Sequence, residues 1–235
     1  MDDNNIAENI KRIREKIAHA AAAAGRRESD IQLMAVTKTV GTQEILKAVS
    51  AGLRLLGENR VQELLTKYDV LHDAGAQIHL IGHLQSNKVS KVIGRAAMIQ
   101  SVDSIPIAVE IDKKSAQAGL VTDILIEVNI AGEASKSGFS PEQTMEAVAE
   151  ISGLRALRIM GMMTVPPICG SSAEIRKHFA AMRRLFVDIS GKKIDNVNCN
   201  ILSMGMSGDY VDAILEGSTM VRIGSAIFGP RQYDK

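Results

Sequence analysis

The sequence predicts an α/β protein of the TIM-barrel type, a (β/α)8 barrel with an additional N-terminal helix. About eight short apolar segments rich in β-branched residues alternate with about eight segments of helical periodicity, and 46% of the 235 residues are hydrophobic. Continuous apolar strands joined by helical segments form parallel sheets that are covered on both faces. Eight such units in about 200 residues match a closed barrel.

The first element is an amphipathic helix that contains the segment KRIREKIAHAAAAAG. Ile6, Ile10, Ile13 and Ile17 recur at helical spacing with charged residues between them. Basic residues before alanines are superficially like a secretory signal, but alanine is too weakly apolar for the core of one. No apolar run approaches the roughly 20 residues that cross a bilayer. We therefore expect a cytoplasmic protein without a membrane segment.

The predicted strands follow in order along the chain. They cover residues 31–38, 53–59, 77–84, 97–103, 122–130, 154–165, 198–206 and 220–229. One of the helical segments between them starts with Ser140, Pro141 and Gln143, the signature of a capping box with a first-turn proline. An open doubly wound sheet is the alternative, although no GxGxxG sequence follows the first strand. Because no linker interrupts the pattern, we expect residues 1–235 to form a single domain.

Composition argues against several classes of function. The 28 basic and 27 acidic residues leave a formal charge of +1, and only 3% of residues are aromatic, which argues against a nucleic-acid partner. Cys169 and Cys199 are far apart and suit a reducing compartment. His79 and His83 lie four residues apart on one predicted strand, about 13 Å, which is too far to share a metal ion.

In barrels of this type the chemistry lies at the carboxyl ends of the strands. The residues at the predicted ends are mostly polar and include few carboxylates: Lys38, Asn59, His83, Asp103, Asn129, Thr164, Ser203 to Ser207, and Arg222 to Ser225. The loops after the last two strands predict a phosphate site, because glycine permits close backbone approach and serine adds hydroxyl donors. The residues concerned are Ser203, Gly205, Ser207, Gly224 and Ser225.

Lys38 ends the first predicted strand, within MAVTKTV, and has no acidic residue within four positions. Beside a phosphate site, a lysine can pair with the phosphate or form a Schiff base. The second role needs a neutral amine, and burial among apolar neighbours can lower a lysine pKa by the roughly three units required. Arg222 stands two residues before Gly224, so on a regular strand both face the same side.

Longer motifs occur in a fixed order: AVTKT (35–39), GENRVQE (57–63), HLIGHLQSNK (79–88), VNIAGEASKSGF (128–139), MGMMTVPP (160–167) and LSMGMSGDYVDAILEGSTMVRIGSAIFG (202–229). From about residue 6 to residue 230, the chain resembles the pyridoxal phosphate homeostasis proteins, single-domain relatives of the N-terminal barrel of bacterial alanine racemase. The resemblance implies a barrel that carries pyridoxal 5′-phosphate (PLP) as a Schiff base on Lys38, with the last two loops as its phosphate cradle. It also implies that Arg222 faces the pyridine nitrogen and that Asn59 and His83 line the cofactor.

The function implied is that of a monomeric, non-catalytic protein that holds PLP reversibly, buffers this reactive aldehyde and delivers it to apo-enzymes. A guanidinium cannot accept a proton, so a pyridine nitrogen facing Arg222 stays unprotonated and the ring is a weaker electron sink. Racemisation also needs acid–base groups on both faces of the α-carbon, and Tyr68, Tyr210 and Tyr233 fall on predicted helices or the tail. Two alternatives stay open: a PLP-dependent racemase of low activity, and a Schiff-base aldolase that uses Lys38 without a cofactor.

Overall fold

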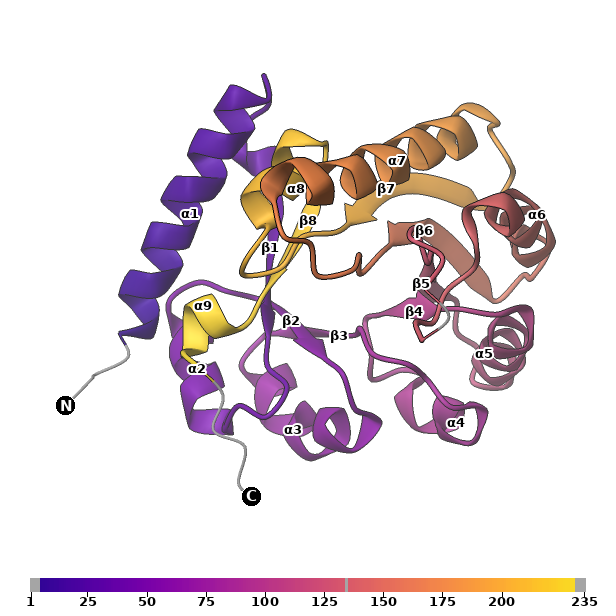
Figure 1. Ribbon diagram of the computed structural model, residues 1–235. Helices are drawn as coiled ribbons and strands as arrows, with labels where there is room; N and C mark the ends of the chain where they lie inside the picture. The colour runs from indigo at the N-terminus through magenta and orange to yellow at the C-terminus, as the bar shows by residue number, and fades with distance from the viewer. Residues whose placement is uncertain (1–4, 134, 231–235) are drawn as a thin grey trace.

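The computed structural model describes residues 5–133 and 135–230. At its centre, parallel strands pair in sequence order and β8 returns to β1, which closes the barrel (Figure 1). The strands are β1 (Gln32–Val36), β2 (Leu55–Glu58), β3 (Gln77–Leu80), β4 (Met98–Val102), β5 (Thr122–Glu127), β6 (Leu157–Met163), β7 (Val197–Ser203) and β8 (Met220–Ile223). The predicted barrel is confirmed, and the open doubly wound sheet is not observed.

The strands end earlier than the sequence predicts. The largest difference is at the last strand, where the predicted segment 220–229 is a strand only to Ile223. Gly224 turns the chain, and the apolar run after it forms one short helical turn instead of continuing the strand. Strand ends are decided by where backbone pairing stops, and an apolar run does not show that point.

Helices cover the outside of the barrel, and each strand is followed by at least one of them (Figure 1). They are α1 (Ile6–Ala23), α2 (Thr42–Ser50), α3 (Val61–Asp73), α4 (Val89–Val92), α5 (Ile105–Gln117), α6 (Pro141–Ser152), α7 (Ser172–Gly191), α8 (Tyr210–Leu215) and α9 (Ser225–Phe228), with 3₁₀ turns η1 (Glu28–Asp30) and η2 (Ser86–Lys88). The predicted capping box at the start of α6 is present, since the side chains of Ser140 and Gln143 bond each other's backbone N–H.

The N-terminal helix α1 completes the outer layer. Because α9 has only four residues, it cannot cover the sheet near β8 by itself. The α1 helix packs against α8, α9 and α2, and in Figure 1 it stands beside α8 and α9. The Asn9 side chain donates to the backbone oxygen of Ile227, 2.9 Å away, and so ties α1 to α9.

Apolar side chains fill two separate regions. The larger region lies between the strands and the helices and includes the predicted isoleucines of α1. The smaller region consists of Met98, Leu125 and Met163 from β4, β5 and β6. Side chains that point into the lumen of a barrel alternate along each strand with those that point outward. Hydrogen bonds across the barrel join further buried side chains that are polar: His79, Gln100, Ser203 and Arg222.

Candidate functional site

A cavity of about 520 Å³ opens at the carboxyl ends of the strands, a size typical of small-molecule sites. Its lining comprises Val36, Lys38, Asn59, Ile81, Val165, Met206, Ser207, Gly208, Arg222, Gly224 and Ser225. The structure therefore brings together Lys38, Asn59, Ser207, Arg222, Gly224 and Ser225 from the residues that the sequence selects. They come from four different strands or the loops after them, so only the closed barrel places them in one cavity.

Lys38 is half-buried and follows the end of β1. The residues on either side of it are held by carboxylates. Thr37 Oγ1 donates to Glu58 Oε1 at 2.7 Å, and the Thr39 N–H donates to Glu63 Oε2 at 2.7 Å. No acidic residue lies within four positions of Lys38 along the chain, yet β2 and α3 supply two carboxylates, 20 residues or more away in sequence, that bond its two neighbours.

A buried lysine, Lys67 on α3, joins these carboxylates. Its Nζ lies 2.8 Å from Glu58 Oε1 and 3.1 Å from Glu63 Oε2, and it donates to the backbone oxygen of Thr37 at 2.9 Å. Burial raises the pKa of Glu58, while hydrogen bonds from Lys67 and Thr37 oppose that shift. The cluster fixes the backbone that carries Lys38. Sequence reasoning missed it, because a lysine on a helix usually faces solvent.

Asn59 contributes an unsatisfied acceptor to the same cavity. Its Oδ1 is buried and has no hydrogen-bond partner among the described residues. A buried polar atom without a partner costs free energy, so such an atom in a cavity wall favours a ligand that can donate to it. The neighbouring Glu58 Oε2 is also buried and has no hydrogen-bond partner among the described residues.

Arg222 on β8 is 3% exposed and held by two acceptors. Its guanidinium donates to Ser203 Oγ at 2.6 Å and to the backbone oxygen of Thr164 at 2.8 Å. Burial lowers the pKa of Arg222 to about 10, against the opposing charges of Glu127 and Asp209. The side chain therefore remains a cation at neutral pH and has one fixed orientation.

The two loops after β7 and β8 meet at Ser207. Its Oγ accepts from the N–H of Gly224 at 3.2 Å and from the N–H of Ala226 at 3.4 Å. No residue in the described ranges accepts the hydroxyl proton of Ser207. The helices that follow the two loops are short, since α8 contains six residues and α9 contains four.

Ser203 and Gly205 belong to the support of the cavity and not to its wall. Ser203 is fully buried, and its oxygen is bonded to both Arg222 and Gln100. Gly205 has a φ of +95°, and a Cβ there would lie 2.6 Å from Ala213 Cβ on α8. Ser203 orients Arg222, and Gly205 permits α8 to pack closely, so the structure gives both residues a supporting contact, and their place in a phosphate cradle stays a prediction.

His83 also lies apart from the lining of the cavity. Its Nδ1 is 2.7 Å from Asp103 Oδ2, and its side chain is 60% exposed. The imidazole is thus paired with a residue at the end of β4 and faces solvent, because the β3 strand stops at Leu80 rather than continuing to residue 84. His83 is not among the residues that line the cavity, and its predicted contact with the cofactor stays a prediction.

The expectation of few carboxylates at the strand ends is wrong as well. Glu58 and Glu127 are the last residues of β2 and β5. Burial, and then the charge of Asp103, raise the pKa of Glu127 to about 7, and Arg222 opposes the shift. The sequence prediction missed both carboxylates as strand-end residues, because it made these two strands one to three residues too long.

Within the described ranges, no three His, Cys, Asp or Glu side chains are grouped to hold a metal ion. No helix in this part of the chain is long and apolar enough to span a bilayer. Cys169 and Cys199 are free thiols, both half-buried.

A closed barrel with a lysine after β1 and an arginine on β8, both facing one cavity, defines the class of the protein as the alanine racemase N-terminal barrel. Residues 1–232 match the family model described as "Alanine racemase, N-terminal domain". The pyridoxal phosphate homeostasis protein of Aquifex aeolicus is 40% identical over 229 residues, which cover 97% of this chain and 100% of that protein. Its counterpart in Escherichia coli K12 is 38% identical and covers 99% of both chains. The chain belongs to the pyridoxal phosphate homeostasis protein family.

A solved structure has the same fold throughout. PipY of Synechococcus elongatus PCC7942 with PLP bound is 31% identical, with a TM-score of 0.83 over 95% of this chain and 100% of that chain. The similarity extends across the whole barrel and is not limited to the segments around the cavity.

Proposed function

We propose that this chain acts in PLP homeostasis by binding the cofactor in the cavity at the carboxyl ends of the strands, as a Schiff base on Lys38 and without efficient turnover. The observation that carries the proposal is that Lys38, Arg222 and the Ser207 loop line a single cavity. Family membership and the PLP-bound PipY structure support it. The unsatisfied Asn59 Oδ1 fits a ligand with a hydroxyl donor such as the one on the PLP ring.

Different residues of the cavity would hold the different parts of the cofactor. Lys38 would hold the aldehyde carbon, and Arg222 would face the ring nitrogen. The Ser207 and Ser225 hydroxyl groups would bind the phosphate, because both line one side of the cavity and the Gly224 N–H, bonded to Ser207 Oγ, joins their two loops. Asn59 lines the ring, while Ser203 and Gly205 hold these groups in place from behind.

Bound PLP supplies an electron-withdrawing ring to a carbon attached through its aldehyde. The chain's own residues limit that property. Arg222 cannot accept or release a proton at neutral pH, so an atom that it faces stays unprotonated. Thr164 and Ser203 hold the guanidinium on two sides and prevent it from turning away.

The lining contains few groups that can exchange protons. Among the described residues that line the cavity, Lys38 and Arg222 carry the ionisable side chains, and the Arg222 guanidinium does not act as a base at neutral pH. A two-base racemisation needs a second group on the opposite face. Tyr68 lies on α3 and Tyr210 on α8, and Tyr233 is outside the described residues. This supports a carrier rather than an efficient racemase. We propose further that the carrier works as a monomer, as one domain, and that it supplies PLP to apo-enzymes.

The test is the visible absorbance of the protein incubated with PLP and then freed of unbound PLP by gel filtration, before and after borohydride, for the wild type and for Lys38→Ala. We expect a band that borohydride removes in the wild type, with PLP fixed to the peptide that contains Lys38, and no such band in the variant. Lys47→Ala is the matched control, because Lys47 is an exposed lysine on the next helix that pairs with Glu44. A band of equal size in Lys38→Ala would overturn the proposed anchor.

A second assay separates a carrier from an enzyme. The PLP-loaded protein is incubated with L- and D-alanine in deuterated water, and proton exchange at the α-carbon is followed by NMR. The proposal predicts exchange no faster than with free PLP. Exchange that is accelerated and lost in Lys38→Ala would instead support the racemase of low activity.

A further inference from the structure

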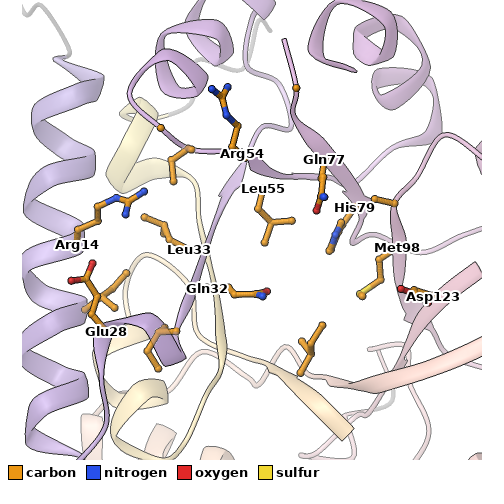
Figure 2. A pocket seen from close by; sticks show the side chains of 17 residues that line it. Arg14, Glu28, Gln32, Leu33, Arg54, Leu55, Gln77, His79, Met98 and Asp123 are labelled. Atoms are coloured by element: carbon orange, nitrogen blue, oxygen red, sulfur yellow. The ribbon is translucent and has the colours of Figure 1, made fainter. Parts of the chain in front are cut away.

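A second cavity lies at the opposite end of the barrel. Its volume is about 720 Å³, and it is lined by residues at the amino ends of β1 to β5 together with α1 and η1. Figure 2 shows its polar and charged lining, in which the labelled residues include Arg14, Glu28, Gln32, Arg54, Gln77 and His79. The size again falls in the range of small-molecule sites, and nothing in the function proposed above uses this cavity.

His79 on β3 is the buried polar group of this cavity. It is 5% exposed, its Nδ1 lies 2.9 Å from Gln100 Nε2, and Figure 2 shows its ring directed into the cavity. No hydrogen bond joins its Nε2 to any residue in the described part of the chain. One nitrogen is therefore fixed from inside the barrel, and the other is left for whatever occupies the cavity.

The hydrogen bonds behind His79 determine which nitrogen carries the proton. Arg222 can only donate, so Ser203 Oγ accepts from it and gives its own proton to Gln100 Oε1 at 2.8 Å. The other end of the Gln100 amide is its NH₂ group, which donates to His79 Nδ1. Nδ1 is then the acceptor, and Nε2 bears the hydrogen. Burial lowers the pKa of His79 to about 4, so the ring is neutral at pH 7.

The charges around the cavity favour an anion slightly. Arg158 binds both carboxylate oxygens of Asp123, at 2.6 and 3.0 Å, which neutralises that acid. The negative charge of Glu28 offsets one of the two positive charges that Arg14 and Arg54 carry. Arg54 is exposed and uses one nitrogen on the backbone oxygen of Ala74, 3.1 Å away, so its other donors remain available.

We propose that this cavity is a second small-molecule site for a monocarboxylate with an apolar body, whose carboxylate accepts from His79 Nε2–H and is attracted by the charges of Arg14 and Arg54 in the lining. Leu33, Leu55 and Met98 supply the apolar wall. A ligand oxygen that accepts from His79 Nε2–H stabilises the tautomer with the proton on Nε2. In that tautomer each group of the chain donates to the next, from Arg222 to Ser203, to Gln100 and to His79. The chain of Gln100 and Ser203 thus connects this site with the cavity at the other end of the barrel.

The experiment uses ¹⁵N-labelled protein without PLP, so that its outcome is independent of the function proposed above. The imidazole signals of His79 are followed while 3-phenylpropionate is added, and 3-phenylpropionamide serves as the neutral isostere. We expect a saturable shift of the Nε2–H signal with the carboxylate and no saturation with the amide. Equal shifts with both probes, or no saturable shift with the carboxylate, would overturn the proposal.

Two variants sharpen the result. Arg54→Ala should weaken binding of 3-phenylpropionate about threefold, because the lining of the cavity loses one exposed positive charge. Arg176→Ala is the control, because Arg176 is an equally exposed arginine on α7 that pairs with Glu216 away from the cavity. In the wild type, the carboxylate should also shift the Arg222 Nε–H signal, and in Gln100→Met that second shift should disappear while binding persists. Loss of affinity in both arginine variants alike would show that only the net charge of the protein is sensed.

Discussion

Lys67 shows how a single buried side chain can organise a site that it does not enter. Its side chain is 10% exposed, and its partner Glu58 is fully buried. Removing one member of a buried ion pair leaves the other charge without compensation, which is more costly than the pair itself is stabilising. The threonines on both sides of Lys38 depend on the same carboxylates.

We therefore expect Lys67→Met to lower the free energy of unfolding by about 3–5 kcal/mol and to weaken PLP binding at Lys38. The measurement is urea unfolding followed by circular dichroism, together with a PLP titration. Lys47→Met, at an exposed pair, should cost less than about 1 kcal/mol. Glu58→Gln added to Lys67→Met should recover part of the loss. If the double variant is no more stable than Lys67→Met, the buried charge is not the cause.

Glu127 predicts a pH dependence of stability. Burial raises its pKa in the folded chain from 4.5 to about 7, so between these values the folded state binds more protons than the unfolded state. Stability then falls as the pH rises from 4.5 to 7. Because burial also raises the pKa of Glu58 and of Asp209, the wild type alone does not isolate the residue.

The difference in the free energy of unfolding between the wild type and Glu127→Gln isolates the contribution of Glu127. Between pH 4.5 and 7, the free energy of unfolding of the wild type should fall by up to about 3 kcal/mol more than that of the variant, since one pKa unit corresponds to about 1.4 kcal/mol. Chemical denaturation at pH 5, 6 and 7 measures this difference. Parallel curves for the two proteins would contradict a raised pKa at this position.

At the scale of elements, the clearest case is α1, which precedes the barrel in sequence and yet belongs to its outer layer. Its isoleucines are nearly completely buried against the barrel's helices, with Ile13 at 4% exposure. The short α9 leaves part of the outer face to be covered, and α1 covers it. The helix is thus a structural part of the barrel rather than an appendage.

Ile13→Ala should therefore destabilise the whole chain by about 2–5 kcal/mol, as large-to-small changes in a packed core do. Lys16→Ala, one turn away on the exposed side of the same helix, should change stability by less than about 0.5 kcal/mol. Thermal unfolding that stays cooperative in both variants checks this. If Ile13→Ala melted in two steps, α1 would be an independent unit.

At the scale of the whole molecule, closure of the barrel depends on one close approach between β6 and β7. The register of these strands shifts between Ile159 and Gly161. Gly161 has a φ of +142°, and a Cβ there would lie 1.9 Å from the backbone oxygen of Ile201. No side chain can be accommodated at that distance without separating the two strands.

Gly161→Ala should consequently cost more than about 3 kcal/mol or prevent folding, because both the φ angle and the contact are unfavourable for alanine. Gly170→Ala is the matched control, since nothing lies within 4 Å of a Cβ at that loop position. Soluble yield and urea midpoints compare the two. A stable Gly161→Ala variant would mean that β7 can move away without opening the barrel.

Much of this architecture follows from local patterns in the sequence. Apolar runs and helical periodicity are set by nearby residues, so the order of the strands, the amphipathic α1 and the capping box of α6 are predictable. The carboxyl ends of parallel strands gather at one rim, which is why Lys38, Asn59, Ser207, Arg222, Gly224 and Ser225 were selected before their contacts were known.

The sequence by itself thus determined the barrel, the rim that carries the cavity and the lysine and arginine within it. Only the tertiary structure decided which side chains meet inside the fold. It turned Ser203 toward Arg222 and Gln100, placed Lys67 against Glu58 and Glu63, and directed His83 to solvent. For Ser203 on β7, the physical reason is that a strand shifted by one residue turns every side chain to its other face. The shift itself is set by pairing with strands that lie tens of residues away.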